Sequence, residues 1–482
     1  MKKHPNGVLF SVWEPVELEC FSCYNRYIAN EEGVFMENRL FSNKQLIRLI
    51  IPLVIEQGLT ILVGMADGVM ISSVGEAAIS GVSLVDMINA VILVLFAALA
   101  TGGAVVTSQF LGARQLEKAK KSVGQLVIMA VVLGIATMVP CLIFDEELLM
   151  LCFGAIEPDV KAAGLKYLQI TALSFPFIAL YNAGAAIFRS MGNSRMSMRA
   201  SLLMNVINVV GNAFCIYVLK WGVYGVAIPT LVSRAAAGIY MMAMAVRPNQ
   251  ILRLTGEGVR SIDRNMMGSI LRIGVPSACE NCFFSLGRLI VASMITLFGT
   301  SQVSANAVAG NIDRLGIIIG QAMGLALVTV VGQCIGARDT DQASYYIKKI
   351  LKWTYVVQGF TNLLIVLFVG PLVDFYSTLA PETRELAMRL STIHASLAII
   401  FWPVSFVLPN ALRASNDVKF TMWVGIGSML MFRIIGSWVL CVQLQWGAVG
   451  VWIAMILDWV CRTGFFVPRM LSGKWKTKYK PT

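Results

Sequence analysis

Long runs of apolar residues separated by short polar loops dominate the chain. Clear examples are residues 123–144, 347–369 and 424–442. At 1.5 Å of rise per helical residue, each run is long enough to cross roughly 30 Å of hydrocarbon. The pattern predicts an all-α integral membrane protein of about twelve transmembrane helices.

The composition supports lipid, and not water, as the solvent around most of the chain. Hydrophobic residues make up 57% of the 482 residues and charged residues only 14%, and the mean hydropathy is +0.72. A soluble globular protein has about a quarter of its residues charged. A soluble fold of this size would therefore leave large apolar areas exposed to water.

The net charge of +12 is distributed as the positive-inside rule requires for a membrane protein, and does not point to a nucleic-acid partner. Acidic or neutral loops alternate with basic ones. The basic groups are Arg114 with Lys118, Lys120 and Lys121; Arg189, Arg195 and Arg199; Arg247, Arg253, Arg260 and Arg264; Arg338 with Lys348 and Lys349; Arg413 with Lys419; and Lys474 to Lys480. The alternation predicts both termini in the cytoplasm and an even number of crossings.

The chain repeats itself at a shift of 224 residues without a gap. Pro52 and Glu56 fall on Pro276 and Glu280, Arg189 falls on Arg413, and the Gly-Ala-Arg of 112–114 falls on 336–338. Glycine suits the left-handed residue expected where a helix ends. Since each repeat holds an even number of spans, we expect two parallel six-helix bundles related by a pseudo-twofold axis along the membrane normal.

The repeat defines the expected domains. Residues 36–246 form an N-lobe with helices 1–6, residues 247–265 a cytoplasmic linker, residues 266–470 a C-lobe with helices 7–12, and residues 471–482 a basic cytoplasmic tail. Residues 1–35 lack an apolar core of adequate length for a signal peptide or a span. We expect them to be a disordered extension, with Met36 as an alternative start.

Several stretches together resemble the multidrug and toxic compound extrusion (MATE) family. They are Ile-Pro-Leu at 51–53, Gly-Met-Ala-Asp at 64–67, Ser-Val-Gly at 73–75, Ser-Gln-Phe-Leu-Gly-Ala at 108–113 with its copy at 333–337, and Trp-Gly-Val-Tyr-Gly-Val-Ala at 221–227. The resemblance covers roughly residues 40–470. It implies a two-lobed bundle around a central cavity that expels organic, often cationic, compounds in exchange for entering sodium ions or protons.

Ionisable residues inside a span are costly and so are functional candidates. Asp67 matches the family's first-helix Asp, which implies a role in cation coupling. Asn208 matches a family Asn of helix 5, and Asn212 stands where many members have Asp, a departure that removes a negative charge from the implied site. The alternatives are an Asp67 capped by water near the outer interface, and asparagines that only bond neighbouring helices.

Glu56 and Glu280 occupy equivalent positions in the two repeats and are expected to face each other across the cavity as a lining for cationic substrates. Arg288, two turns after Glu280, is expected to be its partner or to neutralise it. A structural salt bridge and a role in substrate binding are both open for this group. Asp67 has no acidic counterpart, since Val291 takes that place, so cation coupling is expected in the N-lobe alone.

Other polar residues have simpler interpretations. Asp313 with Arg314, and Asp458 with Arg462, are expected to form local ion pairs. His394 is either a proton shuttle or a residue that hydrogen-bonds inside helix 10. Asp86 and Asn89 line the cavity or cap its outer end, and the lone Cys20-x2-Cys23 pair has no second pair to complete a metal site.

The leading hypothesis is a secondary antiporter in the cell membrane, with a small organic substrate, a coupling cation and membrane lipid as its partners. We expect a monomer that needs no cofactor beyond Na⁺ or H⁺. The absence of a Walker A loop argues against ATP hydrolysis, and enzyme interpretations have little support. The alternative is a lipid-linked saccharide flippase, expected to have a more basic cavity and often two further helices. A membrane scaffold or receptor would not need the buried carboxylates.

Overall fold

The computed structural model describes residues 39–154, 156–256, 258, 261–376 and 379–479. The chain divides into two compact units, Met1–Leu40 and Phe41–Thr482. Only Arg39 and Leu40 of the first unit are described, so the expected N-terminal extension and the Cys20–Cys23 pair lie outside the described residues. All the helices named below belong to the second unit.

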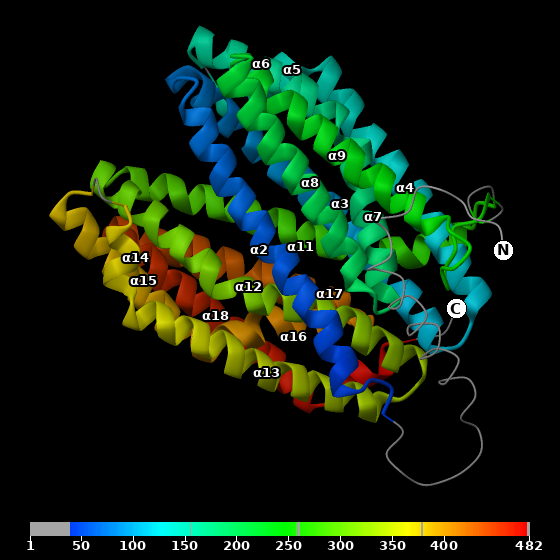
Figure 1. Ribbon diagram of the computed structural model, residues 1–482. Helices are drawn as coiled ribbons and strands as arrows, with labels where there is room; N and C mark the ends of the chain where they lie inside the picture. Colours follow the sequence, from blue (N-terminus) through cyan, green and yellow to red (C-terminus); the bar gives the residue numbers. More distant parts are fainter. Residues whose placement is uncertain (1–38, 155, 257, 259–260, 377–378, 480–482) are drawn as a thin grey trace, which may run out of the picture. The chain divides into compact units, whose positions relative to one another are not determined.

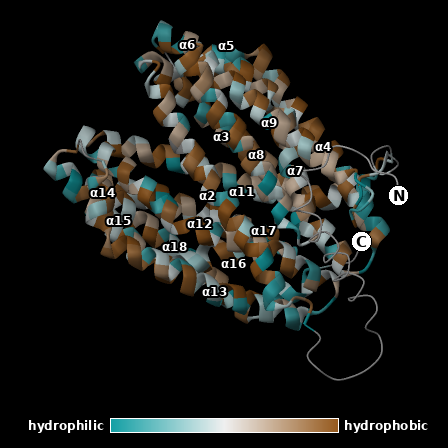
Figure 2. Ribbon diagram, in the orientation of Figure 1, coloured by the Kyte–Doolittle hydropathy of each residue, from teal (hydrophilic) through white to brown (hydrophobic). Residues whose placement is uncertain are grey.

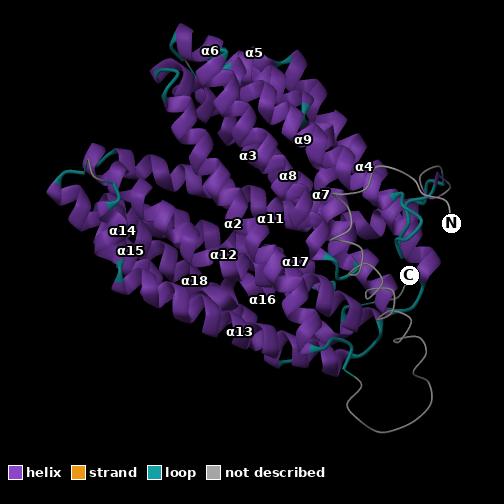
Figure 3. Cartoon of the chain, viewed as in Figure 1, coloured by secondary structure: helices purple, strands orange, loops and turns teal. Residues whose placement is uncertain are grey.

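In the described part of the chain every regular element is a helix (Figure 3). Eleven helices are long and apolar enough to cross a membrane, and a twelfth span results if α6 and α7, bent by 47° at their junction, are taken together. The prediction of an all-α membrane protein with about twelve spans is therefore confirmed.

Among the described residues, the first half of the second unit contains nine helical elements in chain order, most of which Figure 1 labels. They are α2 (Asn43–Ser72), α3 (Glu76–Gly112), α4 (Leu116–Ile143), α5 (Asp145–Phe153), α6 (Pro158–Leu173), α7 (Phe175–Ser190), α8 (Ser194–Ala213), the π-helical turn η2 (Phe214–Val218) and α9 (Tyr224–Ala245).

The second half follows the segment 246–263 and has an equivalent order. Its elements are α11 (Arg264–Thr296), α12 (Thr300–Gly336), α13 (Thr340–Leu367), α14 (Val369–Asp374), α15 (Pro381–Trp402), η3 (Pro403–Val407), α16 (Leu408–Ala414), α17 (Val418–Ser428), η4 (Met429–Ile435), η5 (Trp438–Gln443), α18 (Gly447–Leu471) and the short η6 (Lys474–Thr477).

Local sequence signals explain where the long helices begin. Ser42 and Gln45 form a reciprocal capping box at the start of α2, and the Asp263 side chain accepts from two backbone N–H groups at the start of α11. Pro158 and Pro381 open α6 and α15, where a missing N–H costs nothing because the first turn has no partner for it.

The backbone repeats as closely as the sequence does. Helices α3 and α12 each have 37 residues, and α4 and α13 each have 28. Gly75 and Gly299 precede α3 and α12 with φ of 136° and 88°, values in the left-handed half of φ space that favour glycine. The two halves therefore use one pattern of helix starts and lengths.

The two halves meet along their first helices. α2 packs against α8 of its own half and against α12 of the other, while α11 packs against α3 and α17. Where α3 and α12 approach each other, a Cβ on Gly112 would overlap the backbone of Gln333, and one on Gly336 would overlap the backbone of Gln109.

The expected role of these two glycines was wrong. Gly112 and Gly336 are the last residues of their helices, and the left-handed residues are Arg114 and Arg338, with φ of 57° and 60°. Glycine is needed here because it lets two helix backbones touch.

Hydrophobic residues lie along the lengths of the helices, and hydrophilic residues gather at the helix ends (Figure 2). Many large apolar side chains on the outer faces are exposed, among them Val132, Ile239, Phe360 and Trp423. In water such a surface would favour aggregation, whereas lipid tails solvate it. The pattern agrees with a membrane-embedded bundle.

Candidate functional site

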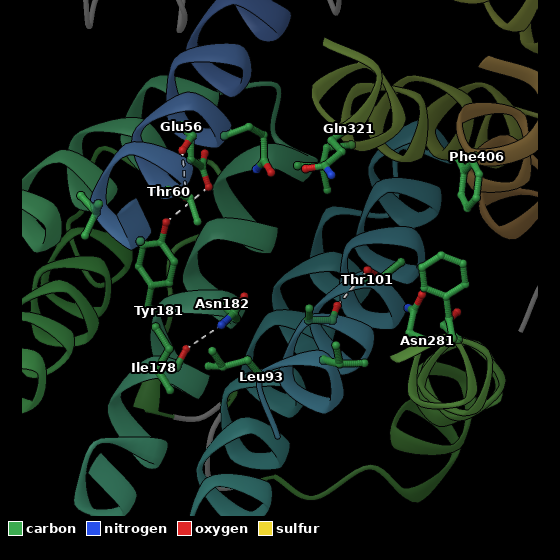
Figure 4. A pocket seen from close by; sticks show the side chains of 18 of the residues that line it. Glu56, Thr60, Leu93, Thr101, Ile178, Tyr181, Asn182, Asn281, Gln321 and Phe406 are labelled. Carbon is green, nitrogen blue, oxygen red and sulfur yellow. Dashed lines mark hydrogen bonds between the residues drawn. The ribbon is translucent and has the colours of Figure 1, made fainter. Parts of the chain in front are cut away.

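A cavity of about 840 Å³ lies between the two halves of the second unit and is lined by side chains from both. Figure 4 shows Tyr181 and Asn182 pointing into it from one side and Asn281 and Phe406 from the other. A concave site of this volume is large enough for a small organic molecule. Asp67, Asn208, Glu56 and Glu280 all lie on its wall.

Asp67 lies among the asparagines that the sequence placed with it. Asn212 Nδ2 donates to Asp67 Oδ1 at 2.7 Å. The Asn208 amide, oriented as its neighbours require, donates to the same carboxylate at 2.9 Å and accepts from Thr230 Oγ1 at 3.1 Å. Within the described residues, no Lys, Arg or His lies within 4.0 Å of Asp67. The three residues expected at the cation site are therefore adjacent, from α2 and α8.

A second carboxylate lies on α3, close to this group. Asp86 Oδ1 accepts from the Tyr167 hydroxyl at 3.1 Å and from Asn89 Nδ2 at 3.4 Å. Of the two interpretations of Asp86, the structure gives the first, because its side chain lines the cavity. Arg234 of α9 also lines it and donates to Ser174 Oγ at 2.9 Å.

Glu56 is buried and accepts three hydrogen bonds. Its Oε1 accepts from the Tyr181 hydroxyl and from Arg189 Nη1, both at 3.3 Å, and its Oε2 accepts from Ser197 Oγ at 2.7 Å. Figure 4 shows the contact of Tyr181 with Glu56. The charge of Glu56 is balanced by the Arg189 guanidinium.

Glu280 is paired in the equivalent way. Arg413 Nη2 donates to Glu280 Oε2 at 2.8 Å, and Arg462 Nη1 lies 3.8 Å from Oε1. Gly425 makes room, since a Cβ there would collide with the Glu280 side chain. The expectation that Arg288 is the partner of Glu280 is not met: Arg288 does not line the cavity, and its charge acts mainly on Asp313.

Arg189 and Arg413 are functional candidates that sequence reasoning assigned to cytoplasmic loops. Both lie on helices, α7 and α16, and both reach the cavity wall. The signal that could have found them was the repeat itself. Two arginines related by the same shift of 224 residues as two intramembrane glutamates are natural partners for those glutamates.

Of the two local ion pairs that the sequence predicted, one is present in the structure and the other is not. Arg462 Nε lies 3.0 Å from Asp458 Oδ1, so the predicted local ion pair is present. Asp313 does not pair with Arg314; its Oδ1 lies 2.7 Å from His394 Nε2 on α15. The expected hydrogen bond of His394 within its own helix is replaced by this contact between helices. The His394 ring also packs edge-on against Trp452 and Trp459.

The cavity wall holds as many acidic as basic side chains. These are Glu56, Asp67, Asp86 and Glu280 on one hand, and Arg189, Arg234, Arg413 and Arg462 on the other. The sequence analysis expected the carboxylates to give the cavity a negative lining. The equal number of arginines shows that the cavity wall as a whole is not negatively charged. The exception is the region of Asp67 and Asp86, where no basic group of the described chain comes within ion-pair distance.

No group of three or more His, Cys, Asp or Glu side chains suited to a metal ion occurs in the part of the chain that the structure describes. The oxygen-rich group around Asp67 consists of carboxylate, amide and hydroxyl oxygens. Such hard oxygen donors suit protons and hard cations better than soft metals.

Comparisons with known proteins agree with this geometry. The MatE family profile matches residues 52–214 and 276–439, two segments whose starts are separated by the repeat shift. The chain is 29% identical to the uncharacterized transporter YisQ of Bacillus subtilis over 431 residues, which is 85% of this chain and 90% of that protein. It is 26% identical to the probable multidrug resistance protein NorM of Thermotoga maritima over 466 residues, covering 95% and 97%.

A solved structure has the same fold. It is described as the outward-facing conformation of a multidrug resistance MATE family transporter of the MOP superfamily, and it matches with a TM-score of 0.83 at 22% identity. The match covers 89% of this chain and 96% of that one.

Proposed function

Because the chain belongs to the MATE (MatE) family of transporters, we propose that it is a secondary active antiporter that exports organic, often cationic, compounds. The exchange is for entering sodium ions or protons, and the two halves rock about their contact to expose the cavity to each side in turn. We propose that transport needs no cofactor other than the coupling ion, Na⁺ or H⁺.

The observation that carries this proposal is the state of Asp67. A carboxylate on a membrane-spanning helix, facing the cavity and without a cationic partner among the described residues, is expensive to keep charged. Asn208 and Asn212 supply hydrogen bonds that stabilise the charged form without cancelling its charge. A proton or a sodium ion supplies the missing charge, and its release restores the unpaired carboxylate.

The energy available to such a cycle is modest. One positive charge that enters the cell gains about 2.3 kcal/mol per 100 mV of membrane potential. For a neutral substrate, one entering cation at a single N-lobe site therefore drives export against a moderate gradient. For a singly charged cationic substrate a one-for-one exchange moves no net charge, so the concentration gradient of the coupling ion drives the export. The alternation of basic loops supports an orientation with both termini in the cytoplasm of a cell-membrane protein, which we take to act as a monomer.

The lipid-linked saccharide flippase is the less favoured function. Such a protein would be expected to have two further helices and a more basic cavity. The described residues contain eleven or twelve spans, and their cavity wall has no excess of basic side chains.

Reconstitution in liposomes tests the proposal. Sodium and proton gradients are imposed separately, and the movement of a fluorescent organic cation is followed for the wild type and for Asp67→Asn. We expect Asp67→Asn to reduce transport to the level of empty liposomes, with unchanged expression and melting temperature. Wild-type transport rates in this variant would remove Asp67 from the mechanism.

Asp374→Asn is a suitable control for the loss of one carboxylate. Asp374 is exposed and pairs with Arg384, with Nε to Oδ1 at 2.5 Å, and it does not line the cavity. This variant should transport at the wild-type rate under both gradients.

A further inference from the structure

Asp86 forms a second acidic position beside Asp67, although it lies on a different helix. Both side chains line the same cavity, and the charge of Asp86 acts on Asp67. Two like charges in one low-dielectric site destabilise the doubly charged state. Binding of a positive charge therefore stabilises an empty site in which both carboxylates are ionised.

Arg234 is the only basic residue that the structure describes near both carboxylates. Its charge acts on Asp86 and on Asp67, yet no atom of its guanidinium comes within 4.0 Å of either carboxylate, and its one direct hydrogen bond goes to Ser174. Arginine stays protonated under all physiological conditions. Arg234 thus provides a permanent positive charge near the two carboxylates but beyond ion-pair distance.

We infer that Asp86 is a further ligand of the coupling-cation site, and that Arg234 is a built-in counter-charge that leaves the empty site with one net negative charge. The inference rests on the proposed function. It explains how this chain compensates for Asn212: the acidic charge that the fifth helix lacks is supplied by α3.

An independent observation indicates that the site takes a ligand. Asn212 is fully buried, its Nδ2 is held by Asp67, and its Oδ1 has no hydrogen-bond partner among the described residues. A buried amide oxygen without a partner costs about 1–3 kcal/mol. A bound cation would satisfy it, either as Na⁺ coordinated by oxygen or as a proton on Asp67 that donates to the amide.

The ligand is therefore a single monovalent cation. The oxygen atoms of the site belong to Asp67, Asp86, Asn212 and the Tyr167 hydroxyl, on four helices. Tyr167 is buried and already donates to Asp86, so the Asp86 carboxylate is held in place before any cation arrives.

The surroundings of the site add no other net charge. The ionisable groups that face it are Asp67 on α2, Asp86 on α3, Tyr167 on α6 and Arg234 on α9, while α8 contributes only asparagines. Elsewhere on the cavity wall, Glu56 is balanced by Arg189 and Glu280 by Arg413. Because the neighbouring pairs are already balanced, a change of charge at Asp86 or Arg234 changes the net charge of the site by the same amount.

The experiment compares Asp86→Asn, Arg234→Gln and the double variant in proteoliposomes. The initial rate of transport of a fluorescent organic cation is measured against Na⁺ concentration at fixed pH, and against pH without Na⁺. Removal of the Asp86 charge should raise the half-maximal cation concentration about tenfold or more, because one attractive unit charge is lost at close range. Arg234→Gln should lower it by a similar factor.

The double variant has the same net site charge as the wild type, so its half-maximal concentration should return towards the wild-type value. Shifts in the Na⁺ titration identify the cation as Na⁺, and shifts in the pH titration without Na⁺ identify it as H⁺. Asp145→Asn on α5, away from the cavity, is the control and should shift neither curve.

Unchanged half-maximal concentrations in Asp86→Asn and Arg234→Gln would overturn the inference, as would a double variant no closer to wild type than the singles. If Asp86→Asn is not recovered as folded protein, Arg234→Gln alone tests the inference, because its half-maximal cation concentration should be lower than that of the wild type. Failure of the proposed function is a separate result, because it appears as the absence of gradient-driven transport by the wild type, while normal transport in Asp67→Asn removes Asp67 from the mechanism.

Discussion

Arg189 on α7 donates to Glu56 on α2 at 3.3 Å, and the two residues are 133 positions apart in the chain. Arg413 and Glu280, also 133 positions apart, repeat this contact in the second half at 2.8 Å. Each half of the molecule thus ties its first helix to its fourth span by the same buried ion pair. The pairs therefore link distant helices within each half.

Removal of Arg413 should destabilise the protein strongly. Arg413→Gln leaves Glu280 buried with only the more distant Arg462, and loss of one partner of a buried pair typically costs about 3–5 kcal/mol. The double variant Glu280→Gln/Arg413→Gln should recover much of the loss. The free energy of unfolding, or the melting temperature in detergent, provides the measurement. Arg384→Gln, at an exposed pair, is the control and should leave the melting temperature nearly unchanged.

Gly112→Ala should force α3 and α12 apart, because the added methyl group would collide with the backbone of Gln333. Backbone atoms cannot move aside as a flexible side chain can, so the conformation described here should lose population. Spin labels at the adjoining ends of the two helices should report a longer distance. Gly310→Ala is the matched control on α12, since a Cβ there meets nothing within 4 Å. Equal distances in the two variants would show that the close approach is unimportant.

Two glutamines join the halves beside these glycines. Gln109 Nε2 donates to the Ala414 carbonyl and Gln333 Nε2 to the Ser190 carbonyl, both at 2.8 Å. Alanine at both positions should remove these bonds, each with a net value of about 1 kcal/mol, and so favour separation of the halves. Hydrogen exchange at residues 105–116 should become faster. Gln302→Ala, at the opposite end of α12, should leave that segment unchanged, and equal protection in all three proteins would count against this role.

Asp263 makes the start of α11 sensitive to acid. The Lys121 ammonium and two backbone N–H groups bond its carboxylate and lower its pKa below the usual 3.8. Because the folded-state pKa is the lower one, the stabilisation is complete above the unfolded pKa and disappears as the pH falls through the folded value. Asp263→Ala should cost about 1 kcal/mol at pH 7, the usual worth of such a cap.

The difference in melting temperature between wild type and Asp263→Ala should therefore shrink as the pH is lowered below about 4. Asp263→Asn keeps a capping oxygen without the charge and should lie between the two proteins at neutral pH. A difference that stays constant down to pH 3 would mean that the charge of Asp263 does not contribute.

The class of the molecule, its approximate number of spans and its internal duplication were all predictable from the amino-acid sequence. These follow from local rules: apolar runs of a given length cross lipid as helices, and two copies of one pattern form two similar bundles. The adjacency of Asp67, Asn208 and Asn212, the residues of the proposed cation site, was also predictable, since equivalent positions in a family lie on equivalent faces.

The neutralisation of individual charges became visible in the folded arrangement of the helices and not before. Glu56 and Glu280 were expected to line the cavity as acids for cationic substrates, yet arginines 133 residues away balance them. Arg288 looked like the natural partner of Glu280 because it lies on the same helix, but helix packing placed Arg413 and Arg462 there instead. Asp86 and Arg234 could not be assigned to the Asp67 site, since their helices meet only in the folded bundle. Charge balance depends on distances in space, and sequence spacing within one helix does not fix those distances between helices.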